Sequence, residues 1–124
     1  MKYDRYPTEA SSTLLQFQFY SKGPKGIIKK QVTFQAFDDN PSVFNLAFGD
    51  ADETGKINDT VVTGNNDSQK VLATVALTVY KFFETHNDCM VYASGSTKAR
   101  TRLYRIGITN NLYEIVKDYE VLDM

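Results

Sequence analysis

The spacing of the hydrophobic residues changes once along the chain, and this change constrains the fold more than any other feature. In residues 14–20, 28–36 and 43–48, apolar and polar side chains alternate, which is typical of strands with one buried face. In residues 68–85, apolar side chains recur at helical spacing and form one broad stripe. Because strands come first and helices later, we expect an α+β fold.

Turn-forming segments separate the expected strands. Residues 21–26 contain Ser, two Gly and a Pro, so the strands on either side should form an antiparallel hairpin. A second break, at residues 38–41, precedes the next alternating segment. Weaker or shorter strands are expected at residues 57–63, 89–93 and 121–122, of which 89–93 reads as buried. The prediction is a mainly antiparallel sheet of four to six strands.

One long helix and two shorter helices should pack on one face of this sheet. The long helix covers residues 68–85, and Asp67 or Ser68 is expected to accept hydrogen bonds from its first amides. The second covers residues 96–106, ended by Gly107, and the third covers residues 110–119. The expected buried edge of the second helix consists of Ala99, Leu103 and Ile106.

Length and composition favour a single domain. The chain has 124 residues, of which we assign 1–12 to an N-terminal extension and 13–124 to one α+β domain. A net charge of -1 gives no global attraction to nucleic acid or anionic lipid. No segment approaches the about 18 apolar residues of a membrane span, so we expect no membrane partner. One cysteine forms no intrachain disulfide and residues 1–7 lack an apolar run, so we expect a cytoplasmic protein.

Several chemistries are disfavoured by the residues present. A zinc site needs three or four ligands, and the chain has one histidine, His86, and one cysteine, Cys89. We place His86 in an exposed turn and Cys89 in a buried strand, where a thiol is inert. Residues 50–58 follow the first eight positions of a calcium loop, but Val61 stands at the twelfth, where a bidentate Glu is required. A polar turn between strands explains the same residues, and we expect neither a metal nor a cofactor.

The strongest candidate for function is the segment of residues 94–105. It combines small hydroxyl residues with four cations. This pattern predicts a turn with free main-chain amides, followed directly by a basic helix. Such amides and the arginines one turn later would bind an anion, with a phosphate or a nucleotide as the expected ligand. The predicted ligand-binding residues are Ser94, Gly95, Ser96, Thr97, Lys98, Arg100, Arg102 and Arg105.

Other interpretations of this segment stay open. The arginines could instead pair with carboxylates such as Glu84, Glu114 or Asp118 and only hold the helix in place. The domain could be a protein-interaction or neutralising module encoded beside a larger protein, and sheet edges could pair in a homodimer. A third hypothesis is an enzyme that uses carboxylates with Arg102, but without a suitable histidine we lean against catalysis. The carboxylates in question are Asp50, Asp52 and Asp59.

Several blocks of the sequence resemble a family of short bacterial proteins classed only as a domain of unknown function. The blocks lie at residues 23–30, 44–50, 54–59, 70–76 and 95–105. The last, Gly-Ser-Thr-Lys-Ala-Arg-Thr-Arg-Leu-Tyr-Arg, is the most specific and coincides with the candidate binding segment. The resemblance implies one intact domain and brings no activity, ligand or catalytic residue with it.

Overall fold

The computed structural model of the chain describes residues 4–51, 57–58, 64–93, 98, 102 and 105–112. Residues 105–112 are helical, as are residues 98 and 102, and we call 105–112 the C-terminal helical segment. The other elements are β1 (Glu9–Ala10), β2 (Gln16–Gly23), β3 (Gly26–Phe37), β4 (Asn40–Ala51), β5 (Ile57–Asn58), α1 (Ser68–Thr85) and β6 (Met90–Ala93).

The strands form one six-stranded sheet of mixed direction. Neighbours pair antiparallel in the order β1-β2-β3-β4-β5, whereas β6 pairs parallel with β4. The parallel strand has a topological cause, because α1 crosses the sheet between β5 and β6 and returns the chain in the direction of β4. The α+β class is therefore confirmed, and the parallel strand qualifies the expectation of a mainly antiparallel sheet.

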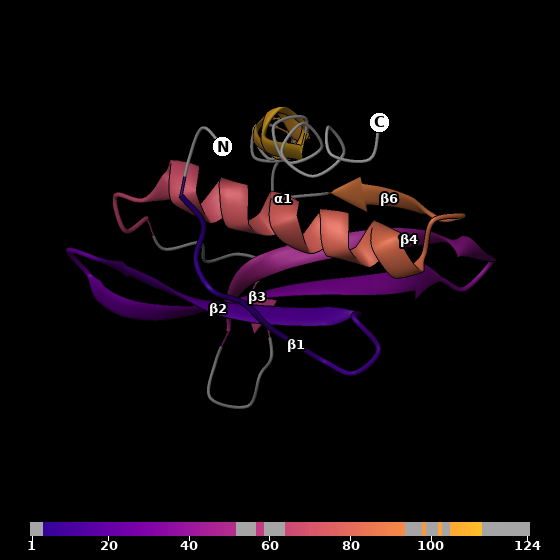
Figure 1. Ribbon diagram of the computed structural model, residues 1–124, viewed down its shortest axis with the longest axis horizontal. Helices are drawn as coiled ribbons and strands as arrows, with labels where there is room; N and C mark the ends of the chain where they lie inside the picture. The colour runs from indigo at the N-terminus through magenta and orange to yellow at the C-terminus, as the bar shows by residue number, and fades with distance from the viewer. Residues whose placement is uncertain are drawn as a thin grey trace, which may run out of the picture.

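Both described helical runs lie on the same side of the sheet. Figure 1 shows α1 lying across the sheet and the C-terminal helical segment, in yellow, on the far side of α1. The other side of the sheet, which we call the outer face, carries no described helix. Among the described residues, no helix has both the length and the apolar character that a membrane crossing requires.

The core lies between the sheet and α1 and is built around aromatic rings. Phe82 of α1 stacks on Phe34 of β3, with ring centroids 4.4 Å apart, and meets Phe44 of β4 edge to face at 5.0 Å. Most strand residues predicted to face inward are buried, namely Phe17, Phe19, Val32, Phe34, Phe44, Leu46 and Phe48, whereas Leu15, Ile28 and Ala36 are half-buried. The same face of β3 also buries Lys30, which the alternation did not identify.

Residues 4–12, assigned above to an extension, pack against the rest of the domain. Tyr6 is 6% exposed and its ring stacks on Phe19 of β2, with centroids 5.8 Å apart. The Tyr6 amide donates to the hydroxyl of Thr74 at 2.9 Å, and β1 pairs with β2. Tyr6 thereby joins the first residues of the chain to both layers of the core.

The structure corrects the expected cap of α1. Asp67 is the N-cap residue, but its side chain makes no capping hydrogen bond. Its Oδ2 instead accepts from the hydroxyls of Tyr6 and Ser21, each at 2.6 Å. The carboxylate is therefore used to join the N-terminal residues and β2 to the start of α1, and it is not available to the first amides of the helix.

The prediction that Gly107 ends a helix is wrong, because the helix runs through it from 105 to 112. A Cβ at this position would lie 2.6 Å from Cδ1 of Leu72 in α1, so the glycine permits close packing of two helices. Ile106, predicted to be buried, is 50% exposed, while Ile108 is buried. The predicted Ala99 and Leu103, the helix residues beyond 112 and the strand at 121–122 lie outside the described residues.

The segment after α1 is less buried than expected. The strand predicted at residues 89–93 is present as β6, but Met90 is 57% and Tyr92 46% exposed. Met90 and Tyr92 pair in register with Val43 and Asn45, which alternate with the buried Phe44 and Leu46, so their side chains point to the outer face of the sheet. The expectation of a buried strand is therefore wrong.

Candidate functional site

Of the residues predicted to bind an anion, Lys98, Arg102 and Arg105 lie within the described part of the chain. All three are helical and exposed. Their spacing of i, i+4 and i+7 is the spacing of residues that share one face in a helix, and we call the three residues the basic stripe. The other predicted residues, Ser94, Gly95, Ser96, Thr97 and Arg100, lie outside the described residues.

The basic stripe is attached to the end of β6 through Arg105. Its Nε donates a hydrogen bond of 3.2 Å to the main-chain oxygen of Ala93, the last residue of β6. This contact fixes the base of the guanidinium group, and its two terminal nitrogens have no partner among the described residues. Such a group keeps its charge and part of its donor capacity for a further contact.

Within the described part of the chain, no ion pair joins Lys98 or Arg102 to a carboxylate. Glu84, one of the three carboxylates considered as partners, is exposed at the end of α1. The other two, Glu114 and Asp118, lie outside the described residues. Lys98 and Arg102 are themselves exposed.

The carboxylate of Asp50 is committed elsewhere. Asp50 is paired in register with Lys30 of β3, and the two side chains form an ion pair in which the lysine is 2% exposed. Asp50 is both the first residue of the calcium-like segment and one of the three carboxylates of the enzyme hypothesis. Its side chain is already engaged in this ion pair. Asp52, Asp59 and Val61 lie outside the described residues.

His86 and Cys89 occupy structural positions. The His86 ring is half-buried, not exposed, and stacks on Phe82 with centroids 4.4 Å apart. Its Nδ1 lies 3.1 Å from the main-chain oxygen of Phe82, so the ring closes the last turn of α1. Cys89 is a half-buried free thiol whose amide donates to the His86 oxygen at 3.2 Å.

The fold alters the ionisation of Tyr6. Burial raises the pKa of the Tyr6 hydroxyl above its ordinary value of 10.0, and the hydrogen bond to Asp67 raises the pKa further. The ammonium group of Lys70 lies over the Tyr6 ring, 4.2 Å from its centroid. These contacts hold the N-terminal residues in place, and we assign this cluster a structural role.

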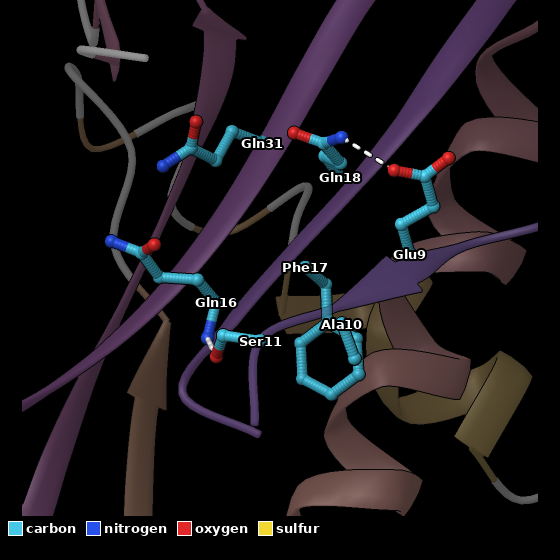
Figure 2. A pocket seen from close by; sticks show the side chains of 7 residues that line it. All are labelled: Glu9, Ala10, Ser11, Gln16, Phe17, Gln18 and Gln31. Atoms are coloured by element: carbon cyan, nitrogen blue, oxygen red, sulfur yellow. Dashed lines mark hydrogen bonds between the residues drawn. The ribbon is translucent and has the colours of Figure 1, made fainter. Parts of the chain in front are cut away.

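A pocket on the outer face of the sheet was not predicted. Its volume is about 250 Å³, and glutamine side chains from β2 and β3 line it together with residues of β1 and the turn that follows (Figure 2). The sequence carried a signal for it, because Gln16, Gln18 and Gln31 alternate with apolar residues on two strands. Only the register of the sheet brings these glutamines together.

The comparisons with known proteins place the chain in a family without adding a function. No curated protein and no solved structure matches it. A family model matches residues 2–124, nearly the whole chain. The chain therefore belongs to DUF6934, a family of unknown function.

Proposed function

We propose that this protein is a small non-catalytic binding protein that recognises an anion through residues 94–105, with a phosphate-bearing ligand of the nucleotide class as the guest. The observation that carries the proposal is the basic stripe, in which Lys98 and Arg102 are exposed and unpaired with any described carboxylate. Three cations on one helical face concentrate positive potential on a chain whose net charge is only -1.

Arginine chemistry favours phosphate over a simple monovalent anion. A guanidinium group presents donors in a planar fork that matches two oxygens of one phosphate group. The bond from Arg105 Nε to Ala93 would orient this fork beside the end of β6. The sequence argument adds the amides and hydroxyls of Ser94, Gly95, Ser96 and Thr97 and the side chain of Arg100, and these contributions are part of the proposal.

Thermal unfolding in the presence of anions tests this function. Inorganic phosphate, AMP, cyclic AMP and ATP are the probes, and ligand at ten times its Kd should stabilise the fold by about 1.4 kcal/mol. Stabilisation should shrink as ionic strength rises, because exposed charges are screened. Adenosine, which lacks phosphate, separates recognition of the phosphate from recognition of the base.

Matched variants locate the effect. Lys98→Ala and Arg102→Ala should each abolish most of the stabilisation, whereas Lys25→Ala should not, because Lys25 is an exposed cation that lies elsewhere, on the turn between β2 and β3. The proposal fails if none of the four phosphate compounds stabilises the protein. It also fails if Lys25→Ala reduces the effect as much as Arg102→Ala does.

A second candidate function, a protein-interaction module, is supported by the exposed side chains of β6. Met90 and Tyr92 of this edge strand are 57% and 46% exposed. Ile106, which directly follows Arg105 in the sequence, is 50% exposed. An edge strand can pair with a second chain, including another copy of this protein. Light scattering on the wild type and on Met90→Lys tests whether the protein forms a homodimer. If it does, the wild type should be a dimer and Met90→Lys a monomer.

The setting proposed for either function is the cytoplasm. The chain has one cysteine, so neither function depends on an intrachain disulfide.

A further inference from the structure

The pocket on the outer face is lined by groups that both donate and accept hydrogen bonds. Three of its seven lining residues are glutamines, and the others include the hydroxyl of Ser11 and the carboxylate of Glu9. Each primary amide offers an oxygen acceptor and two N–H donors, and a hydroxyl offers one donor and two acceptor lone pairs. The pocket is thus rich in hydrogen-bonding groups and has no cation among its lining residues.

The register of the sheet sets the arrangement of these groups. Gln18 lies opposite Glu9 in β1 on one side and opposite Gln31 in β3 on the other. Facing side chains in adjacent strands have their Cβ atoms about 5 Å apart, so the three form a row across three strands. Gln16 lies two residues from Gln18 and shares its face, and Figure 2 shows the amides of Gln16 and Gln31 extending to the same side.

Part of the hydrogen-bonding capacity of this row is unused. Gln18 Nε2 donates to Glu9 Oε2 at 2.8 Å, which orients both side chains. The contact of Gln31 Nε2 with the Thr33 hydroxyl is long, at 3.4 Å, although Gln31 is only 8% exposed. The Gln31 oxygen and the Gln16 amide have no partner among the described side chains. An amide held in a nearly buried position with spare capacity is suited to a guest.

A second hollow of about 180 Å³ adjoins the first, since Glu9 and Gln18 line both. It adds the ring of Tyr20, which is 43% exposed and lies on the same face of β2 as Gln18, and the cation of Lys22, whose charge is opposite to that of Glu9. A tyrosine ring offers an apolar surface with a polar tip, and such a surface can pack against the C–H face of a sugar ring.

From these groups we infer a binding site for a small neutral polyhydroxylated molecule, of the monosaccharide or polyol class. Neighbouring hydroxyls donate and accept at once, and this alternation matches a row of amides and one carboxylate. Glu9 would repel a phosphate, so this site is distinct from the basic stripe. The volume lies below the roughly 300–1,000 Å³ of pockets for drug-sized ligands, which limits the guest to about one ring.

NMR titration of the full chain tests the site. The probes are glucose, galactose, mannose and myo-inositol, each at millimolar concentration. Adenosine, which carries a base, and inorganic phosphate, which carries a charge, are the comparison ligands. At least one sugar or inositol should shift the side-chain NH₂ signals of Gln16, Gln18 and Gln31. Gln16→Leu and Gln31→Leu, which keep side-chain volume, should each weaken this binding by about tenfold.

The matched control is Gln35→Leu, because Gln35 lies on the same face of β3, is exposed and does not line the pocket. Its binding should equal that of the wild type. The proposal is overturned if no sugar or polyol shifts these signals, if only adenosine or phosphate does, or if Gln35→Leu weakens binding as much as Gln31→Leu. Gln16→Leu removes an exposed side chain, so it reports on the site even if Gln31→Leu does not fold.

Discussion

The hydroxyl of Tyr6 donates a 2.6 Å hydrogen bond to Oδ2 of Asp67, and the same oxygen accepts a second 2.6 Å bond from Ser21. One carboxylate therefore connects the N-terminal residues, strand β2 and the start of α1. Short hydrogen bonds to an ionised acceptor are stronger than bonds between neutral groups. This cluster is a principal contact that holds residues 4–12 against the domain.

Tyr6→Phe should lower the free energy of unfolding by about 1–2 kcal/mol, because it removes the hydroxyl that donates to Asp67 and accepts from the Lys22 amide, while the buried ring is kept. Asp67→Ala should cost more, since it leaves the hydroxyls of both Tyr6 and Ser21 without their acceptor. Urea unfolding at neutral pH measures both values. Tyr20→Phe, at an exposed tyrosine, is the control and should change stability by less than about 0.5 kcal/mol.

The raised pKa of Tyr6 predicts a loss of stability in alkaline solution. The unfolded chain ionises this hydroxyl near 10.0, whereas the folded chain keeps the proton to higher pH because of burial and the bond to Asp67. Above the unfolded pKa the unfolded state binds fewer protons, so stability falls as the pH rises through the folded pKa. Below that window the contribution of Tyr6 is fully present.

Urea midpoints measured at neutral pH and at values just above 10.0 test this dependence. Tyr6→Phe should show a smaller loss between the two conditions than the wild type, because it has no proton to lose. Comparing the two proteins removes the contribution of the lysines, which they share. Equal losses in the two proteins would contradict the prediction.

The sequence was sufficient for the parts of the fold that local periodicity determines. The strands around Phe17, Phe34 and Leu46 and the helix around Phe82 follow from the spacing of apolar residues, because the pleat and the helix each impose a fixed period. The exposure of Lys98 and Arg102 follows from the same patterning.

The features that sequence analysis missed depend on contacts between distant residues. The burial of Lys30 is not evident from the sequence, because a lysine is buried only with a partner, and the register supplies that partner in Asp50. Asp67 occupies the expected N-cap position, but distant hydroxyls compete successfully for its side chain. Likewise, the outer pocket exists only because the register places Gln18 opposite Gln31.

The ion pair of Lys30 and Asp50 gives a third prediction. Lys30 is 2% exposed and Asp50 15%, so removing either partner leaves a charge in a poorly solvated position. Lys30→Met and Asp50→Leu should each cost about 3–5 kcal/mol, whereas the double variant should cost clearly less than the sum. Denaturant unfolding of the four proteins of this cycle measures the coupling. Additive losses would show that the two charges do not depend on each other.

Close packing of the C-terminal helical segment on α1 gives the last prediction. A methyl group at position 107 would lie 2.6 Å from Leu72 Cδ1 and 3.4 Å from its Cγ, and Leu72 is 7% exposed, so the leucine has little room to move. Alanine gains up to about 1 kcal/mol over glycine in a helix, but overpacking a core costs typically 1–3 kcal/mol. Gly107→Ala should therefore destabilise the fold.

Shortening the partner separates packing from helix propensity. In a Leu72→Ala background the clash is gone, so Gly107→Ala should become neutral or stabilising. Thermal unfolding of the wild type, the two single variants and the double variant measures this change of sign. If Gly107→Ala destabilises both backgrounds equally, the glycine serves some purpose other than the approach of these two helices.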